Sequence, residues 1–147
     1  RLTERASMFL LDTNVLSEPL RPHPEARVLA WLDAQSASAL WISSISLAEM
    51  AFGVACLPEG QRKSRLNAAL VDLSDLFAGR ILMFDDHAAR AYGQIASQAR
   101  AAGQGLPIPD GYIAAIAAAR DLAVASRDVH PFRAAGLRVI NPWEFGH

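Results

Sequence analysis

Cysteine and lysine each occur only once among the 147 residues, as Cys56 and Lys63. A single cysteine excludes an internal disulfide and a zinc site built from several thiolates, and it fits a reducing compartment. The sequence also lacks an apolar run of the roughly 20 residues that a membrane-spanning helix needs. We therefore expect a cytoplasmic protein that does not cross a membrane.

An excess of either charge is also absent, since 14 basic residues oppose 15 acidic ones. No global positive field attracts nucleic acid, so such binding would need a local patch or a bound metal ion. The 52% hydrophobic content argues against disorder, and the length suits one domain with its own core. We expect a single domain over residues 8–147. Residues 1–7 are polar, and we interpret them as a disordered or artificially added extension.

Short apolar segments alternate with helical patterns along the chain. Strands are predicted at residues 8–11, 40–42, 80–84, 122–125 and 137–140, and helices at about 14–20, 25–34, 44–56, 61–77, 86–102 and 112–122. We interpret His130, Pro131 and Phe132 as a turn. Strands that are separated by helices favour a three-layer α/β/α fold, with a central parallel sheet of about four to five strands.

Four acidic residues stand near the ends of these predicted elements. Asp12 follows the first strand, Glu49 lies in the helix after the second strand, Asp110 stands at a helix start, and Asp128 follows the fourth strand. Right-handed crossovers can bring these positions to one edge of the sheet. Carboxylates that converge repel each other unless a cation is bound, and oxygen ligands favour Mg²⁺ or Mn²⁺. Such ions promote attack of water on phosphodiesters.

Four segments of the sequence resemble the PIN-domain ribonucleases of the VapC toxin type. They are Leu11-Asp12-Thr13-Asn14-Val15-Leu16, Ser46-Leu47-Ala48-Glu49, Pro109-Asp110-Gly111-Tyr112-Ile113-Ala114-Ala115 and Ser126-Arg127-Asp128-Val129-His130-Pro131-Phe132. The terminal segment, Val139-Ile140-Asn141-Pro142-Trp143, resembles the FitB-like branch. The similarity covers about residues 8–143, and the ordered set is far more specific than any one segment.

This resemblance implies a PIN-like domain that cleaves RNA with water activated by Mg²⁺ or Mn²⁺, as the toxin of a type II toxin-antitoxin system. A cognate VapB-type antitoxin would hold it inactive, and a homodimer within a larger toxin-antitoxin complex is expected. Asp12, Glu49 and Asp110 match the three central acids of the family. The family often has a second acid before the final Phe, where this chain has Pro131, so Asp128 is expected to fill the fourth role alone.

Around these acids the resemblance assigns supporting polar roles to Thr13, Asn14 and Ser126. Near the acidic edge in sequence, Arg127 and Arg133 are candidates for holding the substrate, and Arg138 is another. Of the remaining charged residues, the segment Gln61-Arg62-Lys63-Ser64-Arg65 is more typical of a solvated helix face than of an RNA contact.

Each acid also has a purely structural interpretation. Asp12 is a good helix cap, Glu49 with Ser46 fits a Ser-x-x-Glu capping box, Asp110 suits a first helical turn, and Asp128 suits a turn. Only their occurrence together in the ordered pattern favours a catalytic site. Asp85, Asp86 and His87 are an alternative candidate for a metal cluster, although a solvated helix start is the better explanation for them.

Two other function classes compete with the nuclease. A receiver-type phosphoacceptor module also gathers carboxylates around Mg²⁺, but it needs a lysine after its last functional strand, and Lys63 falls in a predicted helix. A PIN-like interaction module with little or no cleavage is the other alternative, which Pro131 favours.

Overall fold

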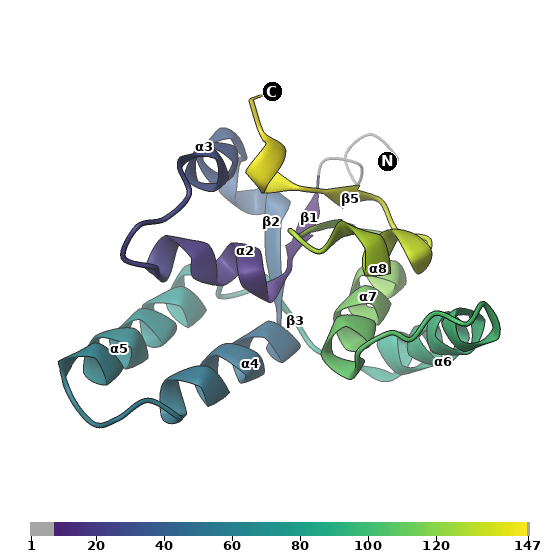
Figure 1. The fold of residues 1–147 in the computed structure, drawn as a ribbon, viewed down its shortest axis with the longest axis horizontal. Coiled ribbons are helices and arrows are strands. Elements are labelled where there is room, and N and C mark those ends of the chain that lie inside the picture. The colour runs from purple at the N-terminus through teal and green to yellow at the C-terminus, as the bar shows by residue number, and fades with distance from the viewer. Residues whose placement is uncertain (1–7, 147) are drawn as a thin grey trace.

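A five-stranded parallel sheet forms the centre of the computed structural model, which describes residues 8–146 (Figure 1). The strands are β1 (Phe9–Leu11), β2 (Leu40–Ser43), β3 (Ile81–Leu82), β4 (Ala123–Ala125) and β5 (Val139–Ile140), in the spatial order β3-β2-β1-β4-β5. Leu10 pairs with Trp41 of β2 on one side and with Val124 of β4 on the other. The first strand is therefore the central one.

Helices cover both faces of this sheet, which confirms the three-layer α/β/α fold. One face carries α2 (Thr13–Ser17), α3 (Ala26–Ala34), α4 (Ser44–Ala55) and α5 (Gln61–Leu76), and the other carries α6 (Asp86–Ala101), α7 (Ile108–Arg120) and α8 (Val129–Ala134) (Figure 1). Short 3-10 helices are η1 (Glu18–Leu20), η2 (Ala37–Ala39) and η3 (Pro142–Glu144).

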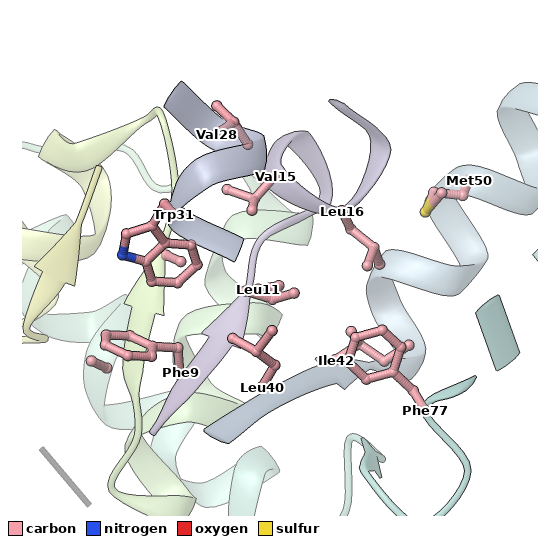
Figure 2. Packing of buried hydrophobic residues seen from close by; sticks show 12 residues of the cluster. Phe9, Leu11, Val15, Leu16, Val28, Trp31, Leu40, Ile42, Met50 and Phe77 are labelled. Atoms are coloured by element: carbon pink, nitrogen blue, oxygen red, sulfur yellow. The ribbon is translucent and has the colours of Figure 1, made fainter. Parts of the chain in front are cut away.

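The alternation of side chains along β1 divides the core into two halves. Phe9 and Leu11 pack with Val15 and Trp31 on the face of α2 and α3, as Figure 2 shows. Leu10 points to the other face and packs against α7, where six small or branched residues between Gly111 and Ala117 are buried. The alanines of α7 let this helix approach the sheet closely. Because β1 is buried on both faces, its carboxyl end, where Asp12 follows, is held in a fixed position.

Residues 129–134 form a helix, so the prediction of a turn at His130, Pro131 and Phe132 was wrong. Pro131 is the third residue of α8, where a missing N–H costs nothing because the first turn has no intrahelical acceptor for it. His130 therefore lies on a short helix, with its side chain exposed.

Two further boundaries differ from the sequence-based prediction. Helix α7 begins at Ile108 rather than Tyr112, because Pro109 is tolerated at the second position of a helix. Strand β3 contains only Ile81 and Leu82, since the N–H of Arg80 bonds to the carbonyl of Phe77 instead of to the sheet.

Between residues 8 and 146, no helix has both the length and the apolar character needed to cross a membrane. The predicted extension at residues 1–7 lies outside the described residues.

Candidate active site

The carboxyl ends of β1 and β4 form the centre of the candidate site. After β1 the chain continues to β2, which lies on one side of β1, while β4 lies on the other side. The chain connections therefore diverge between β1 and β4. Ligands of parallel α/β proteins bind at such a divergence. The N–H of Asp12 donates to the carbonyl of Ala125 at 2.9 Å, which places the first residues after both strands side by side.

Asp12 is a buried carboxylate that accepts hydrogen bonds from two neutral donors. Only 4% of the Asp12 residue is exposed to solvent. The Ser126 hydroxyl donates to Oδ2 at 2.6 Å, and the Thr13 N–H donates to Oδ1 at 2.8 Å. Burial raises the pKa of Asp12 to about 6, the two hydrogen bonds oppose that rise, and the negative charges of Asp110 and Glu49 add to it. A bound cation would relieve this unfavourable charge.

Glu49 reaches the site from α4. Its Oε1 accepts a hydrogen bond of 2.6 Å from the Thr13 hydroxyl. The capping-box interpretation was wrong, because the N-cap of α4 is Ser43, whose Oγ accepts from the N–H of Ser46. Glu49 therefore lies beyond the first turn of the helix, and its carboxylate bonds to Thr13 rather than to the helix end.

Asp110 occupies the third position of α7 and is half-buried. Burial raises its pKa, and the carboxylates of Asp128 and Glu49 raise it further. The predicted location in a first helical turn is confirmed, but a helix N-terminus alone would lower the pKa of an acid rather than raise it. The repulsion among these carboxylates indicates that Asp110 belongs to the same acidic group as Asp12.

Asp128 lies before the first residue of α8 and is exposed. Its N–H donates to the Ser126 hydroxyl at 2.9 Å, and its Oδ2 lies 3.5 Å from the amide nitrogen of Asn14. That amide nitrogen is also 3.4 Å from the Ser126 oxygen. Asn14 and Ser126 thus connect Asp128 with Asp12.

The donor set suits a hard cation. All four side chains offer carboxylate oxygens, and the pKa values of Asp12 and Asp110 are raised by burial first and by neighbouring carboxylates second. Within residues 8–146, no three His, Cys, Asp or Glu side chains are grouped closely enough to hold a metal ion by themselves. Mg²⁺ commonly uses one or two carboxylates together with waters and substrate phosphates, so the residues present fit this ion.

Asp85 and Asp86 are helix-start residues. Asp85 caps α6 by accepting from the N–H of Ala88 at 2.9 Å, and this bond, with the nearby Arg120 guanidinium, lowers its pKa. Asp86 pairs with Arg90 one turn along the helix. These partners support the structural interpretation over the rival metal cluster.

The candidate substrate-binding arginines lie in different surroundings. The Arg127 guanidinium stacks 5.1 Å from the centre of the Trp143 ring, whereas the backbone N–H of Arg127 donates to the Asn14 side-chain oxygen. Arg133 and Arg138 line a groove beside β5 with Val139 and Ile140. Arg127 is thus connected to the acidic site through Asn14. Lys63 extends from α5 to the carboxylate of Glu59 and the carbonyl of Ala55.

Sequence reasoning missed the hydroxyl groups of Ser43 and Ser46, which lie behind Thr13 and are fully buried. Serine at the start of a helix is ordinary capping chemistry, so the sequence offered no signal for a second role.

Comparison with known proteins identifies the family. Residues 9–137 match the PIN domain. The chain is 49% identical to Toxin FitB from Neisseria gonorrhoeae, covering 92% of this chain and 99% of that protein. It is 46% identical to VapC ribonuclease Y4jK from Sinorhizobium fredii, covering 93% and 99%.

Solved structures agree with these sequence matches. A chain in the crystal structure of FitAcB from Neisseria gonorrhoeae superposes with a TM-score of 0.90 at 48% identity, covering 94% of this chain and 100% of that one. VapBC-5 from Mycobacterium tuberculosis, a member of the VapBC family of toxin-antitoxin systems, gives a TM-score of 0.67 at 26% identity, covering 92% and 98%. The chain therefore belongs to the PIN-domain family and, within it, to the VapC type of toxin that includes FitB.

Proposed function

We propose that this chain is a Mg²⁺- or Mn²⁺-dependent endoribonuclease and the toxin component of a type II toxin-antitoxin system. The buried Asp12 carboxylate carries the proposal, because its pKa is raised by burial and by two other acids where the connections of a parallel sheet diverge. A relative named VapC ribonuclease supports RNA as the substrate. One domain spanning residues 8–147 would contain the complete site.

Asp12 and Asp110 are the proposed principal ligands, with Glu49 and Asp128 completing the acidic group. The Ser126 hydroxyl fixes the Asp12 carboxylate, Thr13 fixes Glu49, and Asn14 fixes Asp128. These neutral donors orient the oxygens without cancelling their charge, which leaves the negative charge available to a cation.

When bound, the ion supplies Lewis-acid polarisation of the phosphoryl oxygen and lowers the pKa of water. The chain's own contribution is orientation and proton transfer. Glu49 and Asp128 are the exposed members of the group, so either can accept a proton from the attacking water. Arg127 lies next to Asp128 and can hold the substrate phosphate, which an arginine fork recognises through two hydrogen bonds.

The proposed partners are a cognate VapB-type antitoxin and a second copy of the chain. The matched FitAcB and VapBC-5 structures support assembly with another protein. Free toxin is therefore the correct material for an activity test.

The test is incubation of purified, antitoxin-free protein with structured RNAs in Mg²⁺, in Mn²⁺ and in EDTA. We expect cleavage in both metals, none in EDTA, and a loss of at least about 100-fold for Asp12→Asn. Asp86→Asn is the matched control, because Asp86 is an exposed carboxylate paired with Arg90 outside the site.

Metal-independent cleavage, or full activity of Asp12→Asn, would refute the proposed mechanism. If the protein binds metal and its partner but cleaves none of a broad RNA pool, the interaction-module alternative replaces it.

A further inference from the structure

Three hydroxyl groups form a continuous row that ends at Glu49. Ser43 and Ser46 are both completely buried, and their hydroxyl oxygens are 3.4 Å apart. The Ser46 oxygen lies 2.9 Å from the Thr13 oxygen, which in turn lies 2.6 Å from Glu49 Oε1. The row thus extends from the interior of the protein to the acidic group.

The number of hydroxyl protons determines which group donates in each hydrogen bond of this row. The Thr13 hydroxyl has one proton and two acceptors within reach, Glu49 and Ser46. A carboxylate is the stronger acceptor, so Thr13 donates to Glu49. The contact between Thr13 and Ser46 is then made by the Ser46 proton, since a hydroxyl rotates and can both donate and accept. Ser46 accepts from Ser43 in turn, and all three protons point toward the carboxylate.

Helix capping does not account for the Ser46 hydroxyl. The cap bond uses the backbone N–H of Ser46 and the side chain of Ser43, and alanine at position 46 would preserve it. A buried hydroxyl carries a desolvation cost that alanine would avoid. Glu49, by contrast, is an exposed side chain with several rotamers, and it needs a fixed partner to hold one of them.

We propose that Ser46 is a positioning residue: its hydroxyl holds the Thr13 hydroxyl in the orientation that fixes the Glu49 carboxylate for metal binding. This inference rests on the proposed function, because a fixed Glu49 matters only if the acidic group binds an ion. Thr13 follows Asp12 directly in sequence, so the same row determines the position of Glu49 relative to Asp12.

The test compares Ser46→Ala with Ser44→Ala, a matched loss of a serine hydroxyl two residues earlier in α4. Isothermal titration calorimetry measures the affinity for Mn²⁺, and thermal unfolding in EDTA confirms that each variant is folded. We expect Ser46→Ala to weaken Mn²⁺ binding by about 10-fold and Ser44→Ala to leave it unchanged. In RNA cleavage, kcat at limiting metal should fall while the KM for RNA stays constant.

Thr13→Val and the double variant show whether Ser46 acts through Thr13. We expect Thr13→Val with Ser46→Ala to bind Mn²⁺ as weakly as Thr13→Val alone, because the row is already broken. A folded Ser46→Ala protein with wild-type affinity would overturn the inference, and so would a full additional loss in the double variant. If Ser46→Ala does not fold, Ser46→Cys provides the same comparison with a weaker donor.

Mn²⁺ binding by the wild-type protein distinguishes a failure of the proposed function from a failure of the role proposed for Ser46. Wild-type protein that binds no Mn²⁺ overturns the proposed function and this inference together. Wild-type binding that Ser46→Ala and Ser46→Cys both retain leaves the proposed function standing and removes only the role of Ser46.

Discussion

At the scale of single residues, Asp12 combines the strongest case for function with a cost to stability. Its pKa rises from 3.8 to about 6 on folding. Between these pH values the folded protein holds a proton that the unfolded chain has released, so the free energy of unfolding decreases as the pH rises through this window. Above it, the ionised and buried carboxylate destabilises the protein by about 3 kcal/mol.

Asp12→Asn should therefore stabilise the metal-free protein at neutral pH, by up to about 3 kcal/mol, because it removes the buried charge. Urea unfolding in EDTA measures this difference. The gain should shrink as the pH is lowered from about 6 toward 3.8, where the native side chain becomes neutral as well. An Asp12→Asn protein that is less stable than wild type at neutral pH would show that burial does not penalise this carboxylate.

Glu18 is a buried acid that, unlike Asp12, we expect to stabilise the folded protein. It is only 4% exposed, and its carboxylate accepts from the N–H of Glu25 at 2.9 Å and from Arg21 at 3.2 Å. It thereby ties the residue before α3 to the first residue of η1. We expect Glu18→Ala to lower the free energy of unfolding by roughly 1–3 kcal/mol, because the N–H of Glu25 loses its acceptor.

Glu59→Ala is the comparison for Glu18. Glu59 also pairs with a basic residue, Lys63, but its side chain is 91% exposed, so its removal should change stability by less than about 1 kcal/mol. Metal affinity should be unchanged in both variants, and equal losses of stability would contradict the assignment of Glu18 to the core.

At the scale of elements, the packing of α6 against α7 determines the position of Asp110. Gly111 follows Asp110, and a Cβ atom there would lie 2.9 Å from Tyr92 Cε1 of α6. The Tyr92 ring packs against Phe84 and Tyr112, which restricts its ability to move away. Glycine is thus kept inside a helix, where it costs about 1 kcal/mol relative to alanine.

Gly111→Ala should consequently destabilise the protein by about 1 kcal/mol, since overpacking of 1–3 kcal/mol exceeds the gain in helix propensity. In a Tyr92→Leu background, which removes the ring, the same substitution should become neutral or stabilising. Thermal unfolding of the four proteins measures this coupling. Stabilisation by Gly111→Ala in the wild-type background would mean that the two helices separate at little cost.

The elements show what sequence patterns can and cannot predict. The strand at β1 and the acid after it follow from an apolar run and a polar cluster, and both were predicted. The helix at Val129–Ala134 was missed because a proline in the connection between two strands suggests a turn, although proline is tolerated at a helix start. The role of Glu49 required knowledge of which serine caps α4, and Ser43, Ser44 and Ser46 are chemically equivalent candidates in the sequence.

At the scale of the whole molecule, metal binding and stability should be linked. An ion that binds only the folded protein stabilises it by about 2.7 kcal/mol when its free concentration is 100-fold above Kd. We expect Mg²⁺ or Mn²⁺ to raise the unfolding temperature and EDTA to reverse the rise. The effect should diminish below the pKa of Asp12, about 6, because the ion then competes with a proton.

Asp12→Asn supplies the control for this linkage. Its unfolding temperature should respond to metal much less than that of wild type, whereas Asp86→Asn should respond fully. An equal response in Asp12→Asn would place the ion elsewhere in the molecule.

The whole-molecule architecture was predictable to the extent that alternation of strands and helices implies a parallel sheet. Right-handed connections were expected, but they do not determine the order β3-β2-β1-β4-β5, and the pairing of Asp12 with Ser126 depends on which strand lies beside β1. The ordered acids indicated which residues converge. The distances among them depend on packing between elements that no local pattern contains.

The central position of β1 has a consequence for the order of events during synthesis. Asp12 is made before its hydroxyl partner Ser126, which is 114 positions later in the chain. Domains form as their segments leave the ribosome, and β4 must emerge before it can pair with β1. A nascent or prematurely terminated chain that lacks β4 therefore cannot assemble the acidic group. For a protein whose activity would harm its own cell, this strand order delays the hazard until β4 has been made.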